Sequence, residues 1–157
     1  MGGSGKDAFC NFCDEILPVF NVSSVDTIKQ AARILGWNGE KDEQARYFLA
    51  HMKYLSSRYN NHPYEYIKGR IEEFQKDSSN DIMFIHIREV EEIDKIKRGF
   101  NCQTLFIDNS NIKQITSNEA DAGVYHYKYD VVIDNSGSLN DLRNKAYDFM
   151  VDMFGGD

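Results

Sequence analysis

The chain has 157 residues, 41% of them hydrophobic and 27% charged, and a net charge of −7. This length and composition suit one globular domain with a sizeable core. The acidic balance argues against nonspecific nucleic-acid binding, which needs a basic surface, but allows a basic pocket for a small phosphorylated ligand. No apolar run approaches the ~20 residues of a membrane-spanning helix. We therefore expect neither a nucleic acid nor a membrane as a partner.

Four helices are predicted in the first half of the chain, where apolar residues recur at helical spacing. They span residues 6–20, 23–39, 42–58 and 63–75. Pro18 should end or fray the first helix. Ser23 with Asp26 predicts a capping box for the second, and Gly36 its end. Pro63 lies in the first turn of the fourth helix.

From residue 81 onward the pattern alternates between strands and helices. Short apolar runs predict strands at 81–87, 103–108 and 125–135, and helices are predicted at 88–100 and 138–154. Gly99 should close the first of these helices, and Ser138 with Asp141 should cap the second. The polar stretch 112–123 is expected to be a loop. This order predicts an α/β protein with a mostly parallel sheet.

The chain opens with "MGGSGKD", which matches the end of the phosphate-loop pattern G-x-x-x-x-G-K-[ST]. Glycines let backbone N–H groups converge on phosphate oxygens, and Lys6 would reach the β and γ phosphates. Asp7 stands where a Mg²⁺-binding Ser or Thr is usual, and a carboxylate can also hold Mg²⁺. A Gly/Ser linker fused to an unrelated helix is the alternative.

A strand normally precedes such a loop. The first Gly of the pattern would fall one position before Met1, and the chain has three predicted strands where a sheet of this kind holds about five. We therefore expect that the first strand of the fold is missing. Such a chain should have a poorly formed N-terminal loop, or dimerise by strand exchange to cover the missing strand.

Four segments occur in an order that resembles one protein family. They are "SGKD" (4–7), "SVDTIKQAARILGWNGEKDEQARYFLAHMKYL" (24–55), "IMFIHIREVEEIDKIKRGFNCQTLFI" (82–107) and "YKYDVVIDNSGSLNDL" (127–142). The chain resembles the P-loop nucleoside and deoxynucleoside monophosphate kinases, in the branch that includes phage-type enzymes, and is also similar to animal-type phosphomevalonate kinases. The resemblance covers nearly the whole chain.

The resemblance implies a three-layer P-loop kinase-like fold. Residues 1–157 would form a single domain, with a helical substrate-side insert at about 23–76 and a lid-like loop at about 109–123. The implied activity is ATP-dependent phosphoryl transfer to a (deoxy)nucleoside monophosphate, with ATP and Mg²⁺ as cofactors, in a phage or bacterial protein. The implied ATP-binding residues are Gly2, Gly3, Ser4, Gly5, Lys6, Asp7 and Asn135, with Asp7 also as the metal ligand.

Lys6 and Arg88 are the implied catalytic residues. Arg88 follows the strand 81–87, at the sheet end where α/β proteins bind ligands, and would grip the phosphate of the acceptor. A surface salt bridge with Glu91 or Glu92 is the alternative. Asn135 would border the adenine, and the alternative there is a simple strand-to-helix turn capped by Ser138.

Four basic residues of the helical insert are further candidates for binding the acceptor: Arg33, Lys41, Arg46 and Lys53. Arg46 and Lys53 are seven positions apart and share a helix face. A solvated helix face is the alternative.

The lid departs from the family pattern. Related kinases tend to have an arginine after the strand that corresponds to 103–108, whereas this chain has Asp108 there and Lys113 as the only basic residue of the following segment. The alternatives are therefore a kinase of another small phosphorylated metabolite, or a catalytically inactive nucleotide-binding or interaction module.

The three cysteines and the absence of a signal segment indicate a reducing compartment, and we expect the cytoplasm. Cys10 and Cys13 form a C-x-x-C pair with no second pair, so we interpret them as packing residues in a helix rather than as a zinc or redox site.

Overall fold

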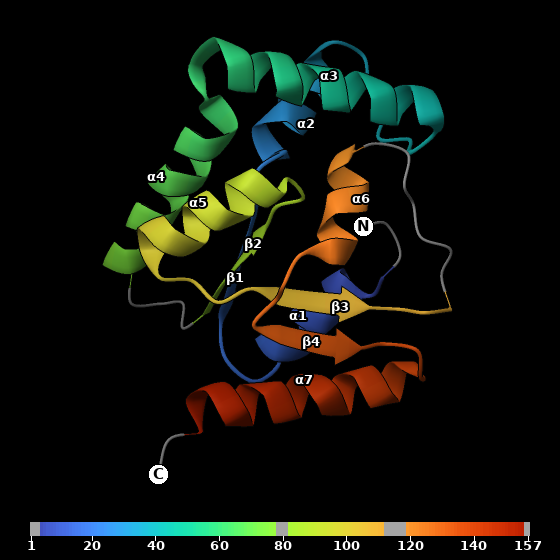
Figure 1. The fold of residues 1–157 in the computed structure, drawn as a ribbon, viewed down its shortest axis with the longest axis vertical. Helices are drawn as coiled ribbons and strands as arrows, with labels where there is room; N and C mark the ends of the chain where they lie inside the picture. The colour runs from blue at the N-terminus through green and yellow to red at the C-terminus, as the bar shows by residue number, and fades with distance from the viewer. Residues whose placement is uncertain (1–3, 78–81, 112–118, 156–157) are drawn as a thin grey trace. The chain divides into compact units, whose positions relative to one another are not determined.

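The computed structural model describes residues 4–77, 82–111 and 119–155. The chain divides into two compact units, one of residues 1–19 with 87–157 and one of residues 20–86 (Figure 1). The first unit holds α1 (Lys6–Asp14), α5 (Val90–Phe100), β3 (Leu105–Asp108), α6 (Glu119–His126), β4 (Val131–Asp134) and α7 (Leu139–Phe154). The second holds β1 (Val19–Ser23), α2 (Asp26–Ile34), α3 (Glu43–Asn60), α4 (His62–Lys76) and β2 (Ile82–His86). The first residue of β1, Val19, is counted with the first unit.

The predicted α/β class is confirmed, in the form of helices with two short two-stranded sheets, β1–β2 and β3–β4. In the first unit β3 and β4 run parallel and side by side, in a register that pairs Leu105 with Val131 and Asp108 with Asp134 (Figure 1). The core of this unit includes the packing of α1 against α7. The rings of Phe9 and Phe149 meet edge to face, 5.5 Å apart between centroids.

The second unit forms its own core under α2, α3 and α4. Val22 of β1, Ile28 of α2 and Ile67 of α4 are each at most 4% exposed. β1 pairs with β2, and just beyond the strands the Ser24 N–H donates to the His86 carbonyl oxygen at 3.2 Å. Within the described residues, no helix is both long and apolar enough to cross a membrane.

The first predicted helix is too long. It ends at Asp14, and residues 19–23 form β1, a strand that the sequence pattern did not reveal. Pro18 cannot continue a helix, and the Asp14 carboxylate accepts the Val19 N–H at 2.8 Å and so fixes the turn into the strand.

The predictions for the stretch between β3 and β4 were also wrong in part. Residues 119–126 form α6, although 112–123 was expected to be a loop and 125–135 a strand. The part of the expected loop at 112–118 lies outside the described residues. The strand itself begins only at Val131. Tyr125 packs its ring edge on Phe106 of β3, 6.1 Å between centroids, so its apolar character reflects helix packing and not strand alternation.

Helix ends were predicted with mixed success. The capping box of Ser138 and Asp141, the Pro63 first turn and the end of α2 at Gly36 are confirmed. At α2 only half of the predicted capping box forms, because Val25 is the N-cap while Asp26 accepts the Ser23 N–H. α5 runs through Gly99 and closes at Asn101, which adopts a left-handed conformation.

The amino end of β4 is tied to the residue that precedes β3. Oδ2 of Asp130 accepts hydrogen bonds from the N–H of Thr104 at 2.8 Å and from its hydroxyl at 2.7 Å, and Lys97 donates to both carboxylate oxygens at 2.6 Å. The Lys97 and Thr104 hydrogen bonds lower the pKa of Asp130 to about 2. This carboxylate therefore holds the β3–β4 register at the end opposite to the candidate site.

Replacing Asp130 with alanine is expected to destabilise the fold by about 1–2 kcal/mol. The loss is small because the ion pair with Lys97 is partly exposed and water weakens it. Because the folded-state pKa lies below the ordinary value, the stabilisation is present above about pH 4 and fades as the pH falls toward 2. Urea unfolding of the two proteins from pH 3 to pH 7 measures the difference, which should shrink at the acidic end. A difference that stays constant over this range would contradict the assignment.

Candidate functional site

The start of α1 has a backbone that requires glycine. Gly5 is the N-cap residue, with a φ of +91°, and its carbonyl oxygen accepts the first helical hydrogen bond from the Phe9 N–H at 2.9 Å. A Cβ on Gly5 would lie 2.2 Å from Nδ2 of Asn135. Both the left-handed conformation and the close approach of Asn135 therefore disfavour larger residues.

Asn135 connects this turn to the strand ends. Its side-chain Nδ2 donates to the carbonyl oxygen of Ser4 at 2.9 Å, and its backbone N–H donates to the carbonyl oxygen of Asp108 at 2.6 Å. Ser4 is 6% exposed. The carboxyl ends of β3 and β4 and the N-terminus of α1 thus meet at one place, as expected for a ligand site in a parallel sheet.

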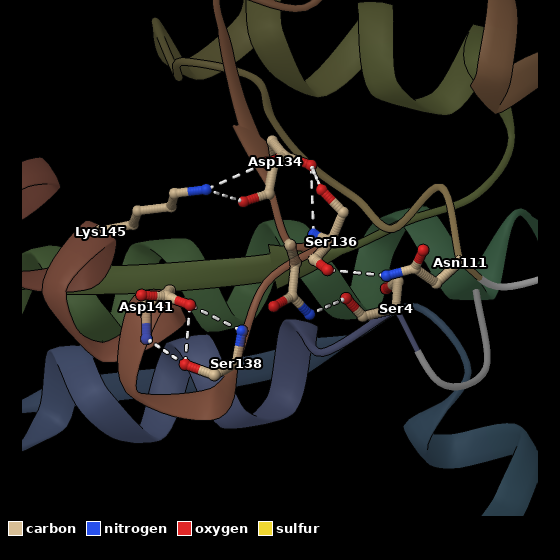
Figure 2. A network of polar contacts seen from close by, with 8 residues as sticks. Ser4, Asn111, Asp134, Ser136, Ser138, Asp141 and Lys145 are labelled. Atoms are coloured by element: carbon tan, nitrogen blue, oxygen red, sulfur yellow. Dashed lines mark hydrogen bonds and ion pairs between the residues drawn. The ribbon is translucent and has the colours of Figure 1, made fainter.

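Figure 2 shows the polar network of the turn that follows β4. Asp134 accepts hydrogen bonds from the N–H and the hydroxyl of Ser136, and Nζ of Lys145 lies 3.1 Å from Asp134 Oδ2 and 2.5 Å from its carbonyl oxygen. The Ser136 hydroxyl, followed by Lys145, holds the pKa of Asp134 below its usual range. Nδ2 of Asn111 donates to the Ser136 carbonyl oxygen at 2.7 Å. The turn is therefore held by hydrogen bonds from the segment after β3, from the end of β4 and from α7.

The same turn also caps α7. The Ser138 N–H and hydroxyl both donate to Oδ2 of Asp141 at 2.7 Å, which lowers the pKa of Asp141 (Figure 2). A Cβ on Gly137 would lie 2.7 Å from this oxygen. The interpretation of this segment as a strand-to-helix turn capped by Ser138 is thus confirmed. The side chain of Asn135 takes no part in the cap and bonds to Ser4 instead.

The first turn of α1 carries one cation and one anion. Lys6 and Asp7 form an ion pair with each other, and their side chains are 34% and 82% exposed. Exposed pairs contribute about 0–1 kcal/mol, so little free energy opposes an exchange of partners. Lys6 and the N–H groups of the first turn suit an anion, and the Asp7 carboxylate suits a hard cation such as Mg²⁺.

Of the other predicted phosphate-loop residues, Gly2 and Gly3 lie outside the described residues. Arg88 lies in the first unit, exposed in the short segment between β2 and α5. In the lid-like segment, Lys113 is outside the described residues, and Asp108 ends β3 with its carbonyl oxygen bonded to Asn135.

The four basic candidates of the helical insert all lie in the second unit. Lys41 and Arg46 are exposed, and the exposed Arg33 places its guanidinium 5.6 Å from the centroid of the Trp37 ring. Lys53 is only 7% exposed, and its Nζ donates to the Ser24 hydroxyl at 2.9 Å. The interpretation as a solvated face is therefore wrong for Lys53, because neighbouring elements cover the side of α3 that carries it.

Sequence reasoning missed several polar partners. Ser24, which is 1% exposed, had no motif to mark it, and Asn111 and Lys145 are far from the strand end that they contact. The one available signal was the density of Asn, Asp and Ser in "DNSN" and "DNSGS", residues that commonly bond to nearby backbone in turns.

The C-x-x-C pair is part of the core of α1. Cys10 is 5% exposed and Cys13 is fully buried, and burial raises the pKa of each thiol to about 12. Over residues 4–77, 82–111 and 119–155, no cluster of three or more His, Cys, Asp or Glu side chains suits a metal ion. The prediction that these cysteines are packing residues agrees with their burial.

The start of α1 and Lys6 thus have the chemistry that suits an anion, and the Asp7 carboxylate beside them has the chemistry that suits a cation. Comparisons of the chain with protein-family models, curated proteins and solved structures find no match.

Proposed function

We propose that the chain binds Mg²⁺–ATP at the start of α1 and transfers the γ-phosphoryl group to a (deoxy)nucleoside monophosphate. The observation that carries this proposal is the left-handed Gly5, followed by Lys6 and Asp7 and hydrogen-bonded through Ser4 to Asn135 at the end of β4. In P-loop proteins a glycine turn between a strand end and a helix holds the phosphates. Here the turn before α1 is hydrogen-bonded to the residue that follows β4. The proposal includes the three-layer P-loop kinase-like fold.

The residues of this site fit the proposed cofactors. Oxygen ligands are the ones that Mg²⁺ prefers, and the exposed Asp7 carboxylate supplies one beside the anion site. Glycine at position 5 has no side chain of its own and allows the left-handed turn that leads into α1. Bound Mg²⁺ would supply charge neutralisation at the phosphates.

The protein residues then act by positioning and charge. Lys6 exchanges Asp7 for phosphate oxygens and stabilises the charge that develops during transfer. Arg88 offers a planar guanidinium to the phosphate of the acceptor. A phosphate acceptor is already anionic, so no general base is required. The assignment of Arg33, Lys41, Arg46 and Lys53 to the acceptor stays a prediction from the sequence.

The test is ADP production from Mg²⁺–ATP with each ribo- and deoxynucleoside monophosphate in turn, and with phosphomevalonate as a separate acceptor. We expect turnover with a nucleoside monophosphate that disappears when EDTA removes Mg²⁺. Turnover with phosphomevalonate alone would favour the metabolite-kinase alternative. Binding of a non-hydrolysable ATP analogue without turnover would favour a nucleotide-binding module, and no binding would contradict the proposal.

A further inference from the structure

One side of α3 is exposed along its whole length. Positions 43, 47, 50, 51, 54 and 58 recur at spacings of three or four and therefore lie on one face of the helix. All six residues are exposed: Glu43, Tyr47, Ala50, His51, Tyr54 and Arg58. Tyr47 and Tyr54 are 66% and 60% exposed. Tyrosine and arginine are enriched at protein interfaces relative to the rest of a protein surface.

This face, named here the α3 face, is also shaped. A shallow hollow of about 320 Å³ is lined by Ala50, His51 and Tyr54. The imidazole of His51 is held in place because its Nδ1 donates to the Tyr47 carbonyl oxygen at 2.9 Å and its ring lies 3.8 Å from that of Tyr47. The α3 face thus presents a shallow hollow beside Tyr54, with the Tyr47 ring placed against the His51 ring next to it.

The positions of the α3 face are symmetric about the midpoint between Ala50 and His51. Tyr47 and Tyr54 are equally far from this midpoint along the chain, and so are Glu43 and Arg58. We propose that the α3 face binds the α3 face of a second copy of this chain, with the two helices antiparallel. A two-fold axis through the midpoint brings each residue against its counterpart, as an isologous interface requires.

Charge selects this arrangement. In the antiparallel dimer Glu43 meets Arg58 of the partner subunit, and the same pair forms again at the other end. A parallel arrangement would instead place Glu43 against the partner subunit's Glu43, which is repulsive. Near the axis, the small Ala50 leaves room for His51 of the partner subunit, and the hollow beside Tyr54 receives the ring of the partner subunit's Tyr47.

The interface is limited by the length of one helix. α3 has 18 residues and is about 27 Å long, so the buried area should be near the low end of specific interfaces, roughly 1,000 Å² in total. We therefore expect a dimer that dissociates in the micromolar range. This inference is independent of the proposed phosphotransfer, because it uses none of the residues of that site.

Sedimentation velocity over a concentration range of about 5 to 500 μM tests the proposal. We expect the intact chain to shift from monomer to dimer, and the single variants Glu43→Arg and Arg58→Glu each to weaken association about tenfold or more by placing like charges together. The double variant should restore dimerisation, because it reverses both partners of each pair.

Lys68→Glu, on the exposed side of α4, is the matched charge-reversal control and should leave association unchanged. Reversal at either helix end is unfavourable for the helix dipole, so thermal unfolding followed by circular dichroism is measured for every variant. The double variant carries both changes that are unfavourable for the helix dipole. Restored dimerisation in this variant therefore cannot result from a more stable α3 helix. A chain that stays monomeric at 500 μM, or a dimer that the single reversals do not weaken, would overturn the proposal.

Discussion

Lys6→Ala is expected to lower kcat for phosphoryl transfer by about 10²–10³-fold, the loss typical of removing one group that stabilises developing charge. Lys6 lies in the first turn of α1 with its side chain 34% exposed and paired to the adjacent Asp7. The ammonium therefore contributes little to the fold and can move to a phosphate. Steady-state kinetics with Mg²⁺–ATP and the preferred acceptor give the measurement.

Lys68→Ala is the matched control, because Lys68 is an exposed lysine of α4 outside the proposed site, and it should keep full activity. Lys6→Arg retains the charge without the compact ammonium and should recover only part of the lost rate. Circular dichroism should show an unchanged fold in all three variants. Full activity in Lys6→Ala would remove Lys6 from the catalytic role, even if nucleotide still binds.

Gly5→Ala is expected to destabilise the first unit by about 2–4 kcal/mol. The left-handed backbone at a φ of +91° contributes about 1–2 kcal/mol of this, and the remainder comes from the added Cβ, which would lie 2.2 Å from Asn135 Nδ2. Urea denaturation measures the change in unfolding free energy. Nucleotide affinity should fall as well, because the turn that carries Lys6 must shift.

Gly39→Ala separates the two contributions. Gly39 has a φ of +96° but no atom within 4 Å of the added Cβ, so only the left-handed strain applies there. In the same way, Gly5→Ala in an Asn135→Ala background should be less damaging than in the intact chain, with a coupling of about 1–2 kcal/mol. Equal effects of Gly5→Ala in both backgrounds would show that Asn135 does not crowd the turn.

The sequence pattern was most informative where neighbouring residues determine the structure. The sequence pattern predicted four helical segments in the first half of the chain near their observed places. It also predicted the strands β2 and β3 and the helix α7. The motif also predicted glycine directly before α1, whereas the expectation of a poorly formed N-terminal loop concerns residues that lie partly outside the described ones. The strand β1 was missed, because Val19–Ser23 is only five residues long and continued the apolar spacing of the preceding helix.

Within the candidate site, the type of each residue was predictable but its partner was not. Asn135 was expected near a nucleotide base, and the structure bonds its amide to Ser4, 131 positions earlier in the chain. Lys53 had the spacing of a surface lysine and is buried against Ser24. The spacing of apolar and polar residues along the chain indicates neither contact, because the partners are 131 and 29 positions apart.

The sequence by itself determined the helix ends that depend on adjacent residues. Ser138 with Asp141, Pro63 and Gly36 are examples, because a cap, a proline or a left-handed glycine acts within three or four positions of the chain. Only the tertiary structure decided that Asp130 bonds to Thr104 and that the amide of Asn135 lies against Gly5. It also decided that Lys53 of α3 is buried while Tyr47 and Tyr54 of the same helix are exposed. The physical reason is that burial and long-range hydrogen bonds depend on which segments pack together, and a lysine or an asparagine carries the same chemistry in either environment until that packing is known.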